Sequence, residues 1–173
     1  MFEKLMRARL DSCTNHNILC TNHFGFSLNS NTSDAIIEFL DNVYSSLDNK
    51  QSTIAEYLDF SKAFDTVNHD IFMSKLQHNG IRGVMQSWFK SYLSNRKQYF
   101  SVKNPSSSMS NITLGVLQGS VLGIVLFLLY INDMYRSSDQ MSFVNFSDDK
   151  TVFTSGSDIN NVHATGNMEL VDL

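Results

Sequence analysis

Three aspartates of this sequence, Asp59, Asp148 and Asp149, have side chains that could together bind a divalent cation. Asp148 and Asp149 are adjacent and stand between two strand-like runs, 141–146 and 151–154. Adjacent aspartates disfavour strand interiors, so we expect them at the tip of a tight hairpin. Magnesium takes oxygen ligands, usually one or two carboxylates with water and substrate phosphates. Because an Asp-Asp pair alone is more often a solvated turn, this chemistry requires a third carboxylate.

Asp59 is the candidate for that third carboxylate. It lies at the end of the strand-like run 52–60 and is followed by a turn into a helix. A strand end and a hairpin tip can bring carboxylates together from distant parts of a chain. The alternative is that Asp59 caps the turn or helix that follows, which is the commoner role for an aspartate in this position.

The remaining pattern predicts a mixed α+β fold that positions these aspartates. Apolar spacing predicts helices over 1–10, 32–47, 84–93 and 121–131. Another helix is expected after the turn at 61–67; it carries Ile71, Phe72 and Leu76 and closes at Gly80 as a left-handed cap. A further strand is expected over 98–103, followed by a surface loop over 104–108. The helix over 32–47 is expected to begin at Thr32 or Ser33 and to bury one face, consisting of Ala35, Ile36, Phe39, Leu40, Val43, Tyr44 and Leu47.

Composition narrows the class of protein. The 173 residues are 42% hydrophobic, which is enough to build a core of one domain or a two-lobed piece of one. The net charge of −4 argues against strong non-specific binding to nucleic acids, so such contacts must come from local patches. One patch consists of Arg96, Lys97 and Lys103 beside Tyr99 and Phe100. This group is either a solvated sheet edge or a nucleic-acid contact.

Two cysteines and the absence of an apolar leader indicate an intracellular, reduced protein, with nucleus and cytoplasm not distinguished. The longest apolar run, 121–131, is too short to cross a membrane. Cys13, His16, Cys20 and His23 could ligate zinc, but their spacing is more cramped than that of structural zinc sites. We therefore expect neither a disulfide nor a zinc site.

Glycines stand on both sides of Gln118, in the segment 114–120 that leads into the apolar helix. Gly115 and Gly119 would allow a ligand or a backbone segment to approach closely. The helix N-terminus behind them could offer N–H groups to an anion such as a phosphate. Simple turn chemistry is an equally good explanation of this loop on its own.

Four motifs in this order resemble the reverse transcriptase of non-LTR (LINE-type) retrotransposons over nearly the whole chain. They are LDFSKAFDTVNH at 58–69, WFKSYLSNRKQ at 88–98, GVLQGSVLG at 115–123 and FSDD at 146–149. The resemblance implies a right-hand polymerase with an antiparallel palm sheet backed by helices. Fingers would occupy about 1–51 and 72–113, the palm about 52–71 and 114–157, and an incomplete C-terminal helix 158–173.

The activity that this resemblance implies is RNA-directed DNA synthesis. A deoxynucleoside triphosphate would be joined to a DNA primer on an RNA template, with two Mg²⁺ ions, or Mn²⁺ in their place, at the reacting phosphate. By resemblance, Asp59 and Asp148 hold the metals, the backbone carbonyl of Phe60 is a further ligand, and Asp149 supports the site. One ion would activate the primer hydroxyl and the other would hold the triphosphate.

The resemblance also assigns residues to the substrate. Phe64 would lie beneath the sugar of the incoming nucleotide and exclude a ribose 2′-hydroxyl, although from the residues alone it is a core aromatic. Ala63 belongs to the same nucleotide site. Gln118 and Gly119 would contact the incoming nucleotide and the template.

Departures from the family pattern define the alternatives. Ser27 and Leu28 stand where basic residues are usual, and Lys150 places a cation beside the acids, where it could compete with metal. The chain ends at Leu173, before the primer grip and thumb of the family, so we expect a truncated copy that is weak or inactive. The alternative is a non-catalytic remnant or an interaction module. A phosphoacceptor receiver domain fits less well, because receivers place the acid pair before the strand-end aspartate; the oligomeric state stays open.

Overall fold

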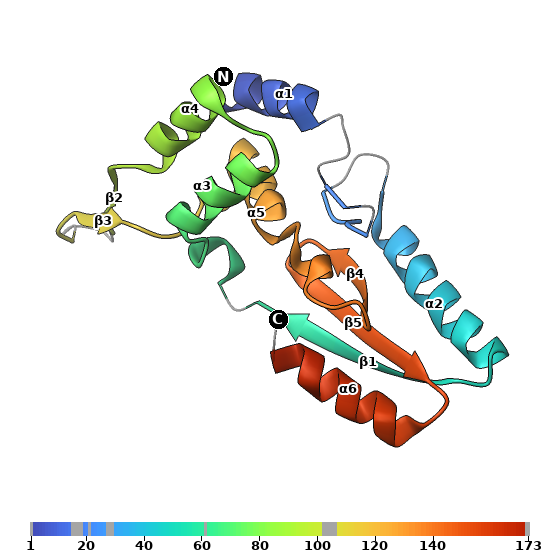
Figure 1. Cartoon of the computed structure of the whole chain (residues 1–173). Helices are drawn as coiled ribbons and strands as arrows, with labels where there is room; N and C mark the ends of the chain where they lie inside the picture. The colour runs from blue at the N-terminus through green and yellow to red at the C-terminus, as the bar shows by residue number, and fades with distance from the viewer. Residues whose placement is uncertain are drawn as a thin grey trace. The chain divides into compact units, whose positions relative to one another are not determined.

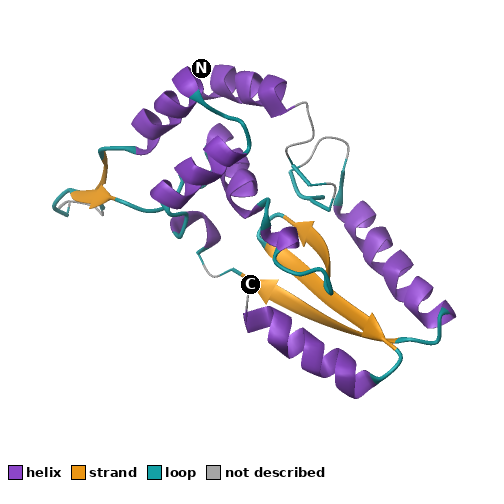
Figure 2. Cartoon of the chain, in the orientation of Figure 1, coloured by secondary structure: helices purple, strands orange, loops and turns teal. Residues whose placement is uncertain are grey.

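The computed structural model describes residues 2–14, 19–20, 22–26, 30–60, 62–101 and 107–171. The chain divides into two compact units, each built from two separate stretches of sequence. Unit 1 comprises Met1–Ile18 and Lys62–Tyr130, and unit 2 comprises Leu19–Ser61 and Ile131–Leu173. Helices and antiparallel strands make up both units (Figures 1 and 2). The α+β class predicted from the sequence is confirmed.

A three-stranded antiparallel sheet forms the centre of unit 2. Its strands are β1 (Ser52–Asp59), β4 (Ser142–Phe146) and β5 (Asp149–Gly156), in the order β1-β5-β4. The two longest strands pair over their full length, from Ser52 opposite Gly156 to Asp59 opposite Asp149. β5 begins two residues earlier and ends two residues later than the run 151–154 predicted it to. The sheet therefore carries β1 and the predicted hairpin side by side.

Each face of this sheet has its own apolar core, because side chains alternate between the faces along a strand. On one face, α2 (Thr32–Asp48) packs through Ala35 and Phe39 against Val144 and Phe153. The other face is covered by α6 (Ile159–Val171) and the short helix η2 (Met134–Arg136), whose side chains join Phe143 and Val152. Unit 2 is thus a sheet between two helical layers (Figure 1).

The predicted buried face of α2 is partly wrong. The helix begins after Asn31, whose side chain accepts hydrogen bonds from two backbone N–H groups while Asp34 completes a capping box. The sheet receives the arc that contains Ala35, Phe39 and Ser46, and Ser46 shares a hydrogen bond with Ser155. Four residues of the predicted buried face are instead exposed, namely Ile36, Leu40, Tyr44 and Leu47, and Ile37 is exposed as well.

Unit 1 is built around the apolar helix α5 (Val121–Ile131), whose residues Leu122, Gly123 and 125–129 are buried. Its other elements are α1 (Phe2–Thr14), the short helix η1 (Ala63–Asp65), α3 (His69–His78), α4 (Gly83–Leu93) and the ribbon of β2 (Arg96–Gln98) with β3 (Ser110–Ile112). Helix α3 is followed by Gly80 at φ +83°, which agrees with the predicted left-handed cap.

The β2–β3 ribbon differs from the predicted strand over 98–103. Pairing runs from Arg96 opposite Ile112 to Gln98 opposite Ser110, so the strand ends where it was expected to begin. Of the predicted loop over 104–108, residues 104–106 lie outside the described part of the chain.

Within the described ranges, none of the helices is long and apolar enough to span a bilayer.

Candidate functional site

Two of the three predicted aspartates lie opposite each other on adjacent strands of the sheet of unit 2. Asp59 is the last residue of β1, Asp149 is the first residue of β5, and the two are direct antiparallel partners. Both lie on the face that α2 covers further along, because Ala55 and Phe153 share their alternation. Side chains opposite each other in such a pair have Cβ atoms roughly 4.5–5.5 Å apart. The two carboxylates are therefore neighbours at the open end of the sheet.

The third aspartate, Asp148, occupies the turn between β4 and β5. The turn contains only Ser147 and Asp148, and Phe146 pairs directly with Asp149 across it. Ser147 has φ +60°, the positive value that a two-residue hairpin requires at its first position. The prediction that both acids lie at the tip is thus half met: Asp148 is in the turn and Asp149 already belongs to the strand.

This arrangement concentrates negative charge at the end of the sheet. Like charges directly opposite each other in an antiparallel pair destabilise it by roughly 0.2–1 kcal/mol. Asp59 and Asp149 are both exposed, which leaves their outer oxygens available to a ligand. A cation bound between them would offset their repulsion. Without a bound cation, the repulsion between these two carboxylates remains as an electrostatic cost to the folded state.

The donor set at this end of the sheet fits Mg²⁺. Three carboxylates and the backbone carbonyl of Phe60, which follows Asp59 directly, are all oxygen ligands of the kind Mg²⁺ takes. Within the described ranges, no three His, Cys, Asp or Glu side chains form a cluster that could hold a metal ion alone. These aspartates could therefore supply only part of a coordination shell, and Mg²⁺ commonly takes the rest from water and substrate phosphates.

Lys150 lies beneath the turn rather than beside the acids on their own face. It follows Asp149 in β5, so its side chain points to the α6 side of the sheet, where it is 1% exposed. Its Nζ donates a hydrogen bond to the Ser147 carbonyl. Burial lowers the pKa of Lys150 to about 8, while Asp148 and Asp149 oppose the fall. The lysine thus stabilises the turn that carries Asp148.

The segment Asn22–Gly25 supports the same hairpin, which the sequence patterns did not indicate. The backbone N–H of Phe24 donates to the Asn145 carbonyl, and that of Asn145 donates to the Asn22 carbonyl, both at 2.9 Å. His23 forms a parallel bridge with Asn145 and is 3% exposed. A Cβ atom on Gly25 would lie 2.1 Å from the Ser147 nitrogen. The one available signal was this glycine between two phenylalanines.

In unit 1, the glycine-rich loop is fixed to the segment that follows Asp59 in the family motif. The backbone N–H of Gly115 donates to the Val67 carbonyl and that of Val116 to the Phe64 carbonyl, both at 2.7 Å. The ring Nε2 of His69 lies 2.8 Å from the Gly115 carbonyl oxygen. Gly115 has φ +88°, and a Cβ atom there would meet the Asp65 backbone at 2.9 Å. The predicted close approach is therefore made by the protein's own backbone.

The start of α5 is capped from within the chain. The Ser120 hydroxyl accepts a hydrogen bond from the Gly123 N–H and donates one to the Leu117 carbonyl, each at 2.8 Å. The Val121 N–H donates to a carboxylate oxygen of Glu3 at 3.0 Å. The anion at this helix N-terminus is thus a side chain of α1, which corrects the expectation that the terminus is open to a ligand. Gln118 and Gly119 remain exposed in the preceding turn.

Phe64 and Ala63 lie in η1, on the inner side of this loop. The Phe64 ring packs against Phe127 of α5, with ring centroids 4.7 Å apart, and is half-buried. Ala63 is buried. The geometry agrees with a core aromatic. Ser27, Leu28 and His16 lie outside the described residues.

Comparison with known proteins adds evidence from sequence. Residues 1–169 match the family described as "Reverse transcriptase (RNA-dependent DNA polymerase)". "Probable RNA-directed DNA polymerase from transposon BS" of Drosophila melanogaster is 32% identical over 138 residues, which cover 78% of this chain and 15% of that protein. "RNA-directed DNA polymerase from mobile element jockey" of the same fly is 27% identical over 167 residues, which cover 92% of this chain and 18% of that protein. The chain spans less than a fifth of the length of these relatives.

Proposed function

Because this chain belongs to the reverse transcriptase family, we propose that it forms part of an RNA-directed DNA polymerase and carries the metal-binding aspartates. The resemblance to reverse transcriptases of LINE-type retrotransposons, predicted from its motifs, is confirmed. The proposed substrates are an RNA template, a DNA primer and deoxynucleoside triphosphates. The proposed cofactor is Mg²⁺, for which Mn²⁺ can substitute.

The opposed pair of Asp59 and Asp149, beside Asp148, is the observation that carries this proposal. Asp59 and Asp148 would hold two metal ions, with the Phe60 carbonyl as a further ligand and Asp149 beside them. When bound, the ions would lower the pKa of the primer hydroxyl and hold the triphosphate. The β1–β5 register keeps Asp59 beside Asp149, and the two-residue turn holds Asp148 next to Asp149 in the chain. This is positioning done before any substrate binds.

Unit 1 would hold the nucleotide and the template. The exposed part of Phe64 would meet the deoxyribose, and its contact with Phe127 would keep the ring from moving aside. Gln118 and Gly119 would contact the nucleotide and template from a loop that three bonds join to residues 64–69. In polymerase terms, we assign the sheet of unit 2 to the palm, and α2, α4 and the β2–β3 ribbon to the fingers.

Extension of a DNA primer on an RNA template tests the metal site. The assay uses the full chain with Mg²⁺ and with Mn²⁺, and compares Asp148→Asn with Asp139→Asn. Asp139 is exposed in a loop away from the hairpin, so it controls for loss of one surface charge. We expect any extension to be lost in Asp148→Asn and kept in Asp139→Asn. Extension that survives Asp148→Asn would reject this assignment, and RNA binding without any extension would favour a non-catalytic binding module.

Sugar selection tests the role of Phe64. Removing the ring in Phe64→Val should raise incorporation of ribonucleotides relative to deoxynucleotides, because the 2′-hydroxyl would no longer meet it. The ratio of the two kcat/KM values measures this directly. Unchanged selection together with lower thermal stability would make Phe64 a core residue only.

A further inference from the structure

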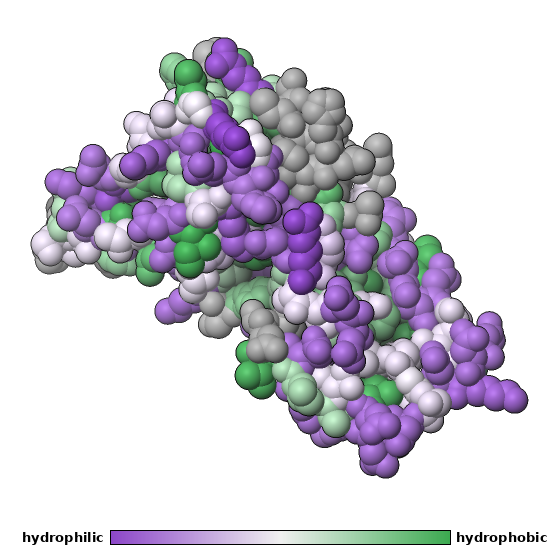
Figure 3. All heavy atoms as spheres, in the orientation of Figure 1, coloured by the Kyte–Doolittle hydropathy of each residue, from purple (hydrophilic) through white to green (hydrophobic). Residues whose placement is uncertain are grey.

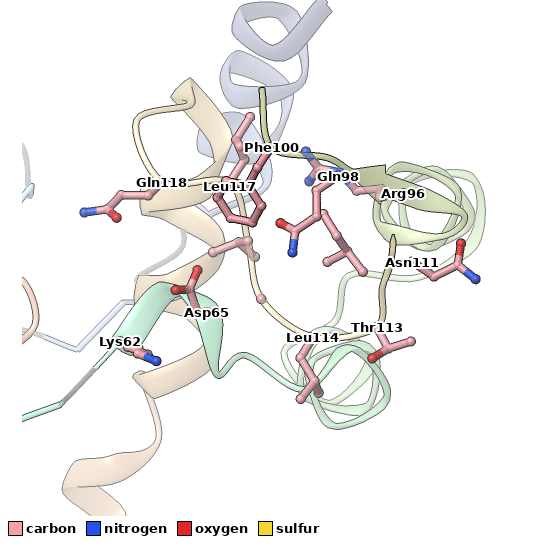
Figure 4. A pocket seen from close by; sticks show the side chains of 13 residues that line it. Lys62, Asp65, Arg96, Gln98, Phe100, Asn111, Thr113, Leu114, Leu117 and Gln118 are labelled. Carbon is pink, nitrogen blue, oxygen red and sulfur yellow. The ribbon is translucent and has the colours of Figure 1, made fainter. Parts of the chain in front are cut away.

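A cavity of about 560 Å³ lies within unit 1, between the β2–β3 ribbon and the loop 113–118. Its volume is within the range of roughly 300–1,000 Å³ that is usual for sites that bind small molecules or parts of polymers. Arg96, Gln98 and Phe100 line it from the ribbon side, and Lys62, Asp65 and Leu117 from the other side (Figure 4). Asp59, Asp148 and Asp149 do not line it.

The lining combines an apolar surface with hydrogen-bonding groups. Phe100 is 72% exposed and Leu117 is 51% exposed, and their side chains lie beside each other at the cavity (Figure 4). The Gln98 amide points into the space between ribbon and loop, whereas the Gln118 amide points away from it (Figure 4). Large apolar side chains in solvent next to an amide that can both donate and accept form a surface for a flat, polar-edged ring.

Local hydrogen bonds hold Phe100 in this exposed position. The Phe100 N–H donates to the Ser107 hydroxyl at 2.8 Å, and the Ser107 N–H donates to the Phe100 carbonyl at 2.7 Å. The backbone at Phe100 is therefore fixed on both sides of the residue. Its ring, 72% exposed, is therefore accessible to a ligand at the cavity.

Arg96 is also held in place. Its guanidinium carbon lies 5.2 Å from the centroid of the Tyr92 ring, and that ring stacks on Trp88 at 5.2 Å with an interplanar angle of 12°. The Tyr92 hydroxyl donates to Glu3 at 2.7 Å, which fixes the ring. A cation anchored on an aromatic stack loses little freedom when it binds an anion, so Arg96 is suited to a phosphate at the rim.

The charges of the cavity favour a nucleobase over a phosphate in its interior. Lys62 and Arg96 attract a polyanion, but the Asp65 carboxylate on the same wall repels a phosphate placed between them. A carboxylate and an amide match the amino and carbonyl groups on the edge of a base. The aromatic surface then takes the base face and the cations take the backbone on either side.

We propose that this cavity binds one unpaired nucleobase of the RNA template, stacked on Phe100 and hydrogen-bonded by Gln98 and Asp65, with Arg96 on the adjoining phosphate. The proposal rests on the proposed function in one respect, namely that an RNA template is the strand this chain handles. It adds a binding site whose lining residues do not include the aspartates. The site reads a single strand, because a paired base cannot turn its edge and face into a cavity.

Binding of a short fluorescein-labelled oligoribonucleotide to the full chain, in EDTA, tests the site without any catalysis. By fluorescence anisotropy, Phe100→Ala should weaken binding at least about fivefold, as expected for loss of one base–aromatic stack. Phe2→Ala is the matched control, since Phe2 is 74% exposed in α1 and does not line the cavity. Phe100→Trp keeps an aromatic face and should bind like the unmodified chain.

A second pair of variants separates the cavity from general attraction between charges. Arg96 lines the cavity and its neighbour Lys97 does not, because successive side chains of a strand point to opposite faces. Arg96→Gln should therefore weaken binding several-fold more than Lys97→Gln. Equal losses, or equal binding by Phe100→Ala and Phe2→Ala, would overturn the proposal.

An oligoribonucleotide with abasic sites separates base from backbone. Weaker binding of the abasic strand to the unmodified chain, with Phe100→Ala binding both strands alike, is the expected result. Abasic and normal strands bound equally well would overturn the base site, as would absence of binding altogether. These outcomes are independent of the primer-extension assay, in which loss of the Asp148 carboxylate is the decisive change.

Discussion

Asp59 and Asp149 are opposed carboxylates at a strand end, where their repulsion lowers the free energy of unfolding unless a cation is bound. The size of this effect can be measured. In metal-free buffer, Asp59→Asn should raise the free energy of unfolding by about 0.2–1 kcal/mol, because one of two facing charges is gone. Added Mg²⁺ should stabilise the unmodified chain more than the variant. Urea unfolding with EDTA and with Mg²⁺ gives both values.

Asp139→Asn again provides the control, because it removes an exposed charge with no partner strand opposite. If Mg²⁺ stabilises the unmodified chain and Asp59→Asn equally, Asp59 is not a metal ligand. If Asp59→Asn is less stable than the unmodified chain in EDTA, the carboxylate has a structural partner that outweighs the repulsion.

His23 predicts how the stability of the protein depends on pH. Burial, together with the positive charge of Lys150, lowers the pKa of His23 to about 4, below its ordinary value of 6.5. Between these values the unfolded chain binds a proton that the folded chain does not, so stability falls as pH falls from 6.5 toward 4. The loss attributable to His23 is up to about 3 kcal/mol, at about 1.4 kcal/mol per pH unit.

The variant His23→Gln should remove this part of the pH dependence and leave the part due to carboxylates unchanged. Urea unfolding of both proteins at about pH 4.5 and about pH 7 gives the difference. A pH dependence that is the same in both proteins would show that His23 is accessible to protons in the folded state.

At the scale of elements, loop 113–118 shows how one glycine can be required for two separate reasons. Gly115 and Gly80 both have positive φ, at +88° and +83°, but only Gly115 has backbone within 3 Å of where a Cβ atom would be. Gly80→Ala should cost about 1 kcal/mol for the strained φ. Gly115→Ala should cost a further 1–3 kcal/mol or so, because the loop must separate from Asp65.

The midpoint of urea unfolding for the two variants checks this difference. Equal midpoints would show that the loop moves away from η1 without loss of stability. In that case the bonds from Gly115 and Val116 to residues 64–67 would not be what holds the loop.

The sequence predicted correctly the elements that depend on residues within their own segment. The hairpin, β1, the cap at Gly80 and the apolar α5 follow from residue types and spacing within the segment itself. β3 could not be predicted, since Ser110–Ile112 is short and polar and becomes a strand only by pairing with β2. The buried face of α2 was misjudged because its apolar residues cover a wide arc, and spacing does not tell which edge of that arc meets a sheet.

The site itself was predicted in the same uneven way. The register that places Asp59 opposite Asp149 agrees with the expected approach of strand end and hairpin, which family motifs suggested. The support from Asn22–Gly25 and the carboxylate of Glu3 at the start of α5 were not foreseen. Both connect residues more than a hundred positions apart, and no periodic pattern in the sequence records such a contact.

At the scale of the whole molecule, the exposed apolar residues of α2 should determine solubility. We call them the apolar stripe; they are Ile36, Ile37, Leu40, Tyr44 and Leu47. Polar residues cover most of the face drawn in Figure 3, with separate apolar residues among them. Ile37 and Leu40 are 55% and 40% exposed and belong to the stripe. The double variant Ile37→Glu, Leu40→Glu should reduce self-association while leaving the unfolding midpoint within about 0.5 kcal/mol of the original.

Size-exclusion chromatography over a range of concentrations measures the association, and urea unfolding measures the stability. The variant Ala35→Glu is the opposite case, because Ala35 is 6% exposed and faces the sheet. It should unfold the unit. A large loss of stability in the double variant as well would show that the stripe is covered in solution.

The pairing of β1 with β5 also determines which deletions within β1 are compatible with the fold. Removing one residue inside β1 turns over every side chain on one side of the deletion, since the alternation has a period of two. Loss of a single codon between Ser52 and Asp59 would therefore either move Asp59 away from Asp149 or exchange the residues that face α2 and α6. Loss of two adjacent codons keeps the parity and only shortens the strand. Among drifting copies of such a gene, odd deletions in this strand should disappear together with function, and even ones should outlast them.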